Sequence, residues 1–426
     1  MGRKMPEMTD LTSALFPKSR TKSNANDTRP TVLMVLTRSL GGEPQAGRLR
    51  TLARIHTVLN SFAEVRTLEV HSLLEEKKYL TFLRLVFFHF LRRSNGLPIQ
   101  CLLFAHSSQI NQVMVAIREQ EPDVLYLDTI RCAPFAMALR KAFPELRIVS
   151  DFDDLMSRRC AALRSLGRGF TLGYLARYLP GFVLKMCQSP AFSGFILKRE
   201  EHSLRTAEAL IASLSDSVTL VSTVDAREFQ ASLPPDTPCD VVVAPPPFAA
   251  IRPVSIPQQP LRFIFIGSDS LLQNRITIEW LCRIWGEFDY TVPLHIYGKQ
   301  SGNYPSHPSV IFEGYAESLD CVYTSNSILL APSFVSGGVK TKVAEALSHG
   351  IIALGNNLTF EGLGIENNPL LFSDPFLATV PSVATQHLES WTSAAQFVQG
   401  IFESEFGFDS YQQAWSRAII PSRQNT

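Results

Sequence analysis

The sequence predicts an α/β protein built from two Rossmann-like, doubly wound domains. Short apolar runs alternate with helical patterns along the chain, which is typical of parallel sheets covered by helices. The chain has 426 residues, more than one domain of ordinary size, and a proline-rich linker at 246–260 divides two such series of strands and helices. Its 45% hydrophobic and 19% charged residues are typical of globular chains.

The composition argues against several classes of function. A net charge of +1 gives no sign of nucleic-acid binding. The seven cysteines are scattered without a C-x-x-C pair, which indicates free thiols in a reducing compartment, and the nine histidines show no metal-ligand spacing with them. No apolar run reaches the roughly 18 residues of a membrane span, and residues 1–29 are predicted to be a mobile polar tail. We therefore expect a cytoplasmic protein without a metal site.

The first domain, residues 30–245, opens with a buried strand and a glycine loop. Gly41 and Gly42 follow the strand, and Arg48 lies in the first turn of the next helix. The loop would let a ligand approach the bare backbone, and Arg48 could meet a phosphate or an acceptor, although such arginines are more often solvated. The pattern is not G-x-G-x-x-G, which disfavours a dinucleotide cofactor. The expected strands are 31–36, 64–70, 123–128, 147–150, 209–213, 217–223 and 241–244.

Charged side chains gather where two of these strands end. Because ligands collect at the carboxyl ends of strands in open α/β sheets, we expect these groups to handle a substrate. A solvated turn with internal Asp–Arg pairs is the alternative. The side chains are Asp128 and Arg131 after the third strand, and Asp151, Asp153, Asp154, Arg158 and Arg159 after the fourth.

Two aromatic and basic stretches interrupt the strand–helix rhythm. Residues 77–104 crowd large apolar side chains into one helical segment with interleaved arginines, as in a core helix or an amphipathic helix on a membrane. Residues 157–199 carry eight basic residues and no acidic one. That pattern suits anionic lipid headgroups or a polyprenyl-diphosphate acceptor, and a helical hairpin with solvated arginines is the alternative.

The second domain, residues 261–402, repeats the alternation of strands and helices. Gly267 ends its first strand, and Arg275 lies near the start of the helix that follows. Further helices are expected at 391–402 and, beyond the domain, at 408–420. The expected strands are 262–268, 294–298, 310–315, 328–331 and 351–354.

The last two of these strands enclose the most informative stretch of the chain. Gly337 and Gly338 form a turn, and Lys340 and Lys342 fall in the first turn of the next helix, where the macrodipole disfavours cations by about 0.3–1 kcal/mol each. An anion bound at this helix start would remove the conflict. Glu345 shares the face of Thr341 and Lys342 and lies about 6 Å further along the axis than Thr341, where it could accept from ribose hydroxyls. An ordinary amphipathic helix with solvated lysines is the alternative.

This stretch, PSFVSGGVKTKVAEALSHGIIALG, resembles the donor site of GT-B glycosyltransferases, in the family 4-like branch that builds bacterial surface polysaccharides. The resemblance implies that Glu345 holds the donor ribose, while the glycine turn and nearby cations hold the diphosphate. Gly337 stands where relatives usually carry another glutamate. The loop DFDDLMSRR is similar to the acceptor-side loop of the same subgroup, although it lacks the histidine of other relatives. The implied donor-binding residues are Gly267, Arg275, Gly337, Gly338, Val339, Lys340, Lys342, Glu345 and Glu361.

The resemblance also implies an architecture and a reaction. The two domains would face each other across a cleft, with the acceptor on the first, the donor on the second, and residues 403–426 crossing back to the first. The reaction would transfer a sugar, with retention, from a nucleoside-diphosphate sugar to a saccharide or polyprenyl-linked acceptor, without metal or cofactor, beside an anionic membrane surface. Lys340 with Asp151, Asp153 or Asp154 would be catalytic, and the acceptor-side residues would be Gly41, Gly42, Arg48, Arg131 and Arg158.

Three other interpretations remain open. The Asp-x-Asp pair at Asp151 and Asp153 also resembles the metal-binding motif of GT-A glycosyltransferases. A nucleotide-sugar epimerase shares the GT-B fold and its donor site. A non-catalytic partner subunit could keep the same fold without chemistry, which the missing glutamate and histidine would explain.

Overall fold

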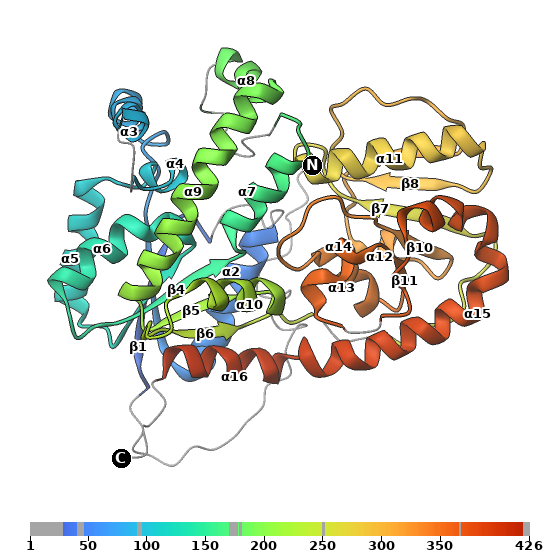
Figure 1. Cartoon of the computed structure of the whole chain (residues 1–426). Coiled ribbons are helices and arrows are strands. Elements are labelled where there is room, and N and C mark those ends of the chain that lie inside the picture. Colours follow the sequence, from blue (N-terminus) through green and yellow to red (C-terminus); the bar gives the residue numbers. More distant parts are fainter. Residues whose placement is uncertain are drawn as a thin grey trace, which may run out of the picture.

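The computed structural model describes residues 29–40, 47–91, 96–169, 178, 181–248, 252–365 and 368–420. The chain forms two parallel sheets with helices packed around them, and the sheets lie side by side (Figure 1). The predicted α/β class with two doubly wound sheets is confirmed.

The first sheet has six strands in the order β2-β1-β3-β4-β5-β6, and every neighbouring pair is parallel. The order reverses between β1 and β3, so a crevice is expected at the carboxyl ends of these two strands. β3 and β5 are buried along their whole lengths, as apolar runs in such sheets are. The strands are β1 (Thr31–Leu36), β2 (Glu64–Glu69), β3 (Val124–Asp128), β4 (Arg147–Asp153), β5 (Ser217–Leu220) and β6 (Asp240–Val243).

Helices cover both faces of this sheet. α2 and α16 pack on one face in a cluster that includes Leu52 and Trp415, while α5, α6, α9 and α10 pack on the other around Phe135 and Leu204. Two short helical segments, α4 (Ile99–Leu102) and η1 (Ile130–Cys132), join them. The longer helices are α2 (Gly47–Phe62), α3 (Tyr79–Leu91), α5 (Ser107–Gln120), α6 (Ala133–Ala142), α7 (Met156–Ser165), α8 (Gly181–Gln188), α9 (Pro190–Leu214), α10 (Thr223–Ser232) and α16 (Phe408–Ile419).

The prediction of a strand at 209–213 is wrong, because these residues form the last turns of α9. Ile211 is buried together with Leu204 and Ala207, at spacings of three, four and seven residues. A short apolar run at the end of an amphipathic helix has the same local composition as a buried strand, so length and neighbouring residues decide between them.

The second sheet has five strands in the order β11-β10-β7-β8-β9, again all parallel. Here the order reverses between β7 and β10, so the loops after these two strands share one crevice. The strands are β7 (Arg262–Ile266), β8 (Leu294–Tyr297), β9 (Val310–Gly314), β10 (Ser327–Leu330) and β11 (Ile352–Leu354). The helices are α11 (Leu272–Phe288), α12 (Leu319–Val322), α13 (Thr341–Ser348), α14 (Asn357–Phe360), η3 (Glu361–Leu363) and α15 (Asp374–Glu405).

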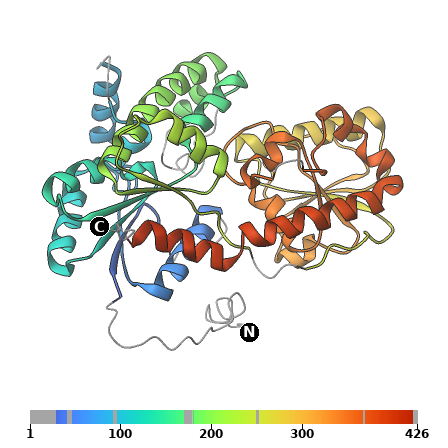
Figure 2. The ribbon, with the colours of Figure 1, turned by 60° about the horizontal axis from the view of Figure 1, so that its bottom comes forward.

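The chain passes between the two sheets twice. α15 runs along the second sheet, and α16 then lies against the first sheet (Figure 2). Trp415 of α16 is buried against Tyr126 of β3, with ring centroids 5.8 Å apart. The two passages touch, because Phe248 donates its backbone N–H to the carbonyl of Phe406 over 3.4 Å. Among the described helices, none is both long enough and apolar enough to cross a bilayer.

Candidate functional site

The glycine turn after β10 faces the first sheet's loops. Gly337 and Gly338 have φ angles of +107° and +60°, which side-chain-bearing residues rarely adopt. A Cβ built at Gly338 would overlap Oδ1 of Asp154, a residue of the loop after β4. The bare backbone of the second sheet's turn therefore receives a carboxylate from the first sheet.

Both amides of this turn already donate to carboxylates. Gly338 N–H donates to Oδ2 of Asp225 over 3.0 Å, and Gly337 N–H donates to Oε2 of Glu361 over 3.2 Å. Arg158 links the two acceptors, because it contacts Oδ1 of Asp225 at 2.8 Å and also pairs with Glu361. In this conformation both amides of the turn are thus occupied by the chain's own carboxylates.

The two predicted lysines point to different partners. Nζ of Lys340 donates to the Gly337 carbonyl over 2.7 Å, so it stays at the turn. Nζ of Lys342 donates to Oδ1 of Asn274 over 2.9 Å and lies 4.0 Å from the ring centroid of Phe265, which places it beside β7 and α11. The expected convergence of both ammonium groups on one anion is therefore not seen, because Asn274 and Phe265 hold Lys342 on the other side of the loop.

Both lysines are poorly stabilised as cations. Burial lowers the pKa of Lys340 to about 8, and the neighbouring Arg159 adds to the shift. Burial, with a further contribution from Lys340, lowers the pKa of Lys342 to about 7. An anion bound at the turn would favour the charged form of Lys340, so anion binding and protonation are coupled there.

Glu345, one turn into α13, also contacts the first sheet's helices. Its Oε1 accepts from Nη1 of Arg50 in α2 over 3.0 Å. Burial raises the pKa of Glu345, and Arg50 and Arg54 oppose the shift. Sequence reasoning missed these two arginines, although their spacing of four residues places them on one face of α2.

Arg48, predicted on the acceptor side, is buried among carboxylates. It is only 8% exposed, and its guanidinium contacts Asp128 at 2.6 Å, Asp151 at 2.7 Å and Asp153 at 3.1 Å. A buried guanidinium needs paired carboxylates, and the ends of β3 and β4 supply them. Arg48 is therefore a structural cation that holds these strand ends together.

Asp151 is equally enclosed, which makes it a poor acid or base. It is 2% exposed, and its two oxygens accept from Arg48, Tyr126, Thr219 and the backbone of Asp153. Each lone pair that could take a proton from a substrate is already engaged. These contacts favour a structural role for Asp151 over the predicted catalytic one.

Asp153 differs from its neighbours. Its φ of +65° is unusual for a residue with a side chain, and 27% of that side chain is exposed. Burial, together with the carboxylates of Asp154 and Asp151, raises its pKa to about 6 despite the nearby Arg48. A strained, accessible carboxyl with a raised pKa is the best candidate base at this edge. Asp154 instead pairs with Arg159 and abuts Gly338.

The remaining predicted residues lie around this centre or outside it. Gly267 packs against the side chain of Asn274, and Arg275 donates to the backbone of Asp269 over 3.2 Å. Val339 packs against the core of the second sheet. Arg131 follows β3 and is half-buried. The predicted acceptor-side residues Gly41 and Gly42 lie outside the described residues.

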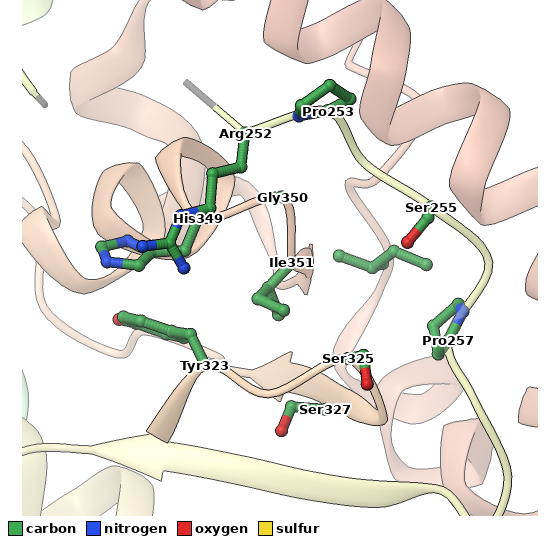
Figure 3. Close-up of a pocket in the computed structure, with 11 residues that line it drawn as sticks. Arg252, Pro253, Ser255, Pro257, Tyr323, Ser325, Ser327, His349, Gly350 and Ile351 are labelled. Carbon is green, nitrogen blue, oxygen red and sulfur yellow. The ribbon is translucent and has the colours of Figure 1, made fainter. Parts of the chain in front are cut away.

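A cavity of about 220 Å³ lies elsewhere on the second sheet (Figure 3). Arg252, Tyr323 and His349 line it, and Ser327 and Ile352 place it at the amino ends of β10 and β11. This is the sheet edge opposite the glycine turn. Across the described residues, no three His, Cys, Asp or Glu side chains gather as a metal site would require.

No protein-family model matches the sequence, and no curated protein matches it. Several solved structures match the chain in fold. The lipopolysaccharide outer core galactosyltransferase WaaB, in its apo form, is 14% identical with a TM-score of 0.55, over 91% of this chain and 99% of that one. HepE from Anabaena, in complex with UDP and glucose, is 12% identical with a TM-score of 0.55, over 92% and 99%. Sucrose-phosphate synthase from Thermosynechococcus elongatus is 10% identical with a TM-score of 0.58, over 91% and 98%. These likenesses are of fold, and they extend over both sheets.

Proposed function

We propose that this chain, which has the GT-B fold, transfers a sugar from a nucleoside-diphosphate sugar to a saccharide acceptor. One observation carries the proposal: the two glycine amides donate to carboxylates at the switch point of the second sheet, with Lys340 beside them and Glu345 one helical turn deeper. HepE, which shares this fold, was solved in complex with UDP and glucose, and this supports a nucleotide-sugar donor here.

The donor would replace the chain's own acids at the turn. Its diphosphate would take the amides of Gly337 and Gly338, and Lys340 would be protonated beside it. Glu345 would leave Arg50 and accept from the ribose hydroxyls. As the bond to the sugar breaks, negative charge grows on the leaving diphosphate, and preorganised donors of this kind stabilise it without reorganisation. This transfer would need neither metal nor cofactor.

The acceptor would approach from the first sheet. Asp153 would orient the attacking hydroxyl or take its proton, a role that its accessible side chain and a pKa raised to about 6 by burial support. Following the family 4-like resemblance, we propose retention of configuration, a hexose as the transferred sugar and a lipid-linked acceptor in polysaccharide or glycoconjugate synthesis. The protein would then work on the cytoplasmic face of a membrane.

A thermal-shift screen with UDP-, GDP-, ADP- and CMP-sugars tests donor binding. One nucleotide should raise Tm by several degrees, since a ligand at about 100 times its Kd stabilises the folded state by about 2.7 kcal/mol. No shift with any nucleotide would contradict the proposal.

Asp225→Asn is the informative variant for that screen. It removes a negative charge that competes with the diphosphate while keeping a group that can accept from Gly338, so we expect a nucleotide Kd about 3–10-fold lower. Asp320→Asn is the matched control, because Asp320 pairs with Arg252 in an exposed contact elsewhere. Equal Kd values for Asp225→Asn and wild type would show that this carboxylate does not compete with the donor.

The pH dependence of kcat/KM is expected to be bell-shaped. Below about pH 6, protonation of Asp153 removes the base, and above about pH 8 Lys340 loses the charge that binds the diphosphate. In Lys340→Arg, whose guanidinium stays charged, the basic limb should move to higher pH while the acidic limb stays. An unmoved basic limb in steady-state kinetics would remove Lys340 from this role.

A non-catalytic partner subunit is the second candidate. The carboxylates that fill the glycine turn favour it, because a chain that never binds a donor could keep them there permanently. Such a protein would release no nucleoside diphosphate with any donor and acceptor. Conversion of the donor into an epimeric nucleotide sugar without an acceptor, seen by product analysis, would instead identify an epimerase.

A further inference from the structure

Helix α3 presents apolar side chains to solvent. Leu80 is 84% exposed, Leu83 60% and Phe87 61%, at spacings of three, four and seven residues that place them on one face. The opposite face, with Phe82 and His89, packs toward the protein. Apolar residues thus lie on both sides of α3, and one side has no protein partner among the described residues.

A second apolar group lies on α8 and the start of α9. Phe182 is 67% exposed and Phe195 60%, with Met186 also exposed. Both views place α3 and α8 on the side of the first sheet away from α16 (Figures 1 and 2). Arg199 of α9 donates to the backbone carbonyl of His89 in α3, which ties the two regions together.

The charge composition of this surface differs from that of an ordinary protein–protein interface. Residues 77–91 and 181–199 contain no aspartate or glutamate, and basic side chains lie between the apolar ones. Arg84 lies over the ring of Phe88 at 5.8 Å, and Lys185 is exposed between Phe182 and Met186. Aromatic and aliphatic groups mixed with cations, without acids, complement the interfacial region of an anionic bilayer.

We propose that α3, α8 and the first turns of α9 form a lipid-docking surface that inserts its apolar side chains into an anionic bilayer. None of these segments crosses the membrane, so the contact is peripheral. The proposal rests on the proposed function in one respect, namely that docking would bring the glycine turn and Asp153 to a lipid-linked acceptor. Binding to lipid itself needs neither donor nor acceptor.

Vesicle co-sedimentation of the full-length protein tests the proposal. We expect binding to phosphatidylcholine vesicles with about one-third phosphatidylglycerol, and at least about tenfold less binding to phosphatidylcholine alone or at high salt. Leu80→Ser/Leu83→Ser/Phe87→Ser should reduce binding to anionic vesicles at least about tenfold. Arg84→Glu/Lys185→Glu should do the same through charge. A control with exposed apolar residues outside this surface, Val115→Ser/Ile256→Ser/Phe397→Ser, should bind as wild type.

Several outcomes would overturn the proposal. These are absence of wild-type binding, equal binding to neutral and anionic vesicles, and wild-type binding by the serine variant. Conversion of a dimer to a monomer by the serine variant, without vesicle binding in either form, would assign this surface to a second copy of the chain. The nucleotide-induced Tm shift of the serine variant should equal that of wild type, so failure of lipid docking and failure of donor binding are told apart.

Discussion

Lys340→Ala should lower kcat for sugar transfer by about 10²–10³-fold, because it removes a preorganised donor from the developing negative charge of the leaving diphosphate. Its effect on the free energy of unfolding should be small. The hydrogen bond that the ammonium group donates to the Gly337 carbonyl is offset by the cost of burying the charge, which lowers its pKa to about 8. Diphosphate release and thermal unfolding measured together test this.

Glu345→Ala probes the same site through binding rather than charge stabilisation. It should raise the nucleotide Kd by about tenfold or more, because a carboxylate that accepts from ribose hydroxyls is lost. Arg50, its present partner, is more than one-third exposed and can turn to solvent, so the fold should persist. Lys299→Ala and Glu389→Ala are exposed controls of matched chemistry and should behave as wild type. Wild-type turnover in both site variants would defeat the site assignment.

Gly338→Ala should reduce sugar-transfer activity and weaken the contact between the glycine turn and the loop after β4. A φ of +60° costs alanine about 1–2 kcal/mol, and the new methyl group would overlap Oδ1 of Asp154. The loop after β4 must withdraw, which separates Asp153 from the donor site. We expect a loss of at least about tenfold in kcat/KM and a lower Tm.

Gly400→Ala provides the matched control. A Cβ at this position in α15 meets nothing within 4 Å, so alanine should leave activity unchanged and stabilise the helix slightly. Adding Asp154→Ala to Gly338→Ala relieves the clash but not the backbone strain, so it should recover part of the Tm. A Gly338→Ala single variant with wild-type activity and Tm would show that the close approach of Asp154 is dispensable.

The sequence predicted the strands and the glycine turn because their signals are local. An apolar run such as that of β10, or two adjacent glycines before an amphipathic helix, requires its conformation from neighbouring residues alone. The missed strand at 209–213 marks the limit of this reasoning, since a few apolar residues suit α9 as well as a strand.

The contents of the site depend on contacts that no local pattern encodes. Asp225 reaches Gly338 across 113 residues, and Arg50 reaches Glu345 across 295. In the sequence, Asp225 is only an acid in the first turn of α10, where an N-capping serine and the helix dipole already account for it. The burial of Arg48 was hidden for the same reason, because its three carboxylate partners come together only when β3 and β4 pair.

The contact between Phe248 and Phe406 limits how the protein can open. Both passages of the chain between the sheets meet at this point, where the ring of Phe248 also packs, tilted, against those of Phe402 and Phe406. Because both connections meet at this contact, we expect the two halves to separate by rotation about it, since sliding would break the aromatic packing. On that expectation substrates would enter on the side away from Phe248 and Phe406, and a bulky group attached there should slow entry more than the same group placed beside the phenylalanines.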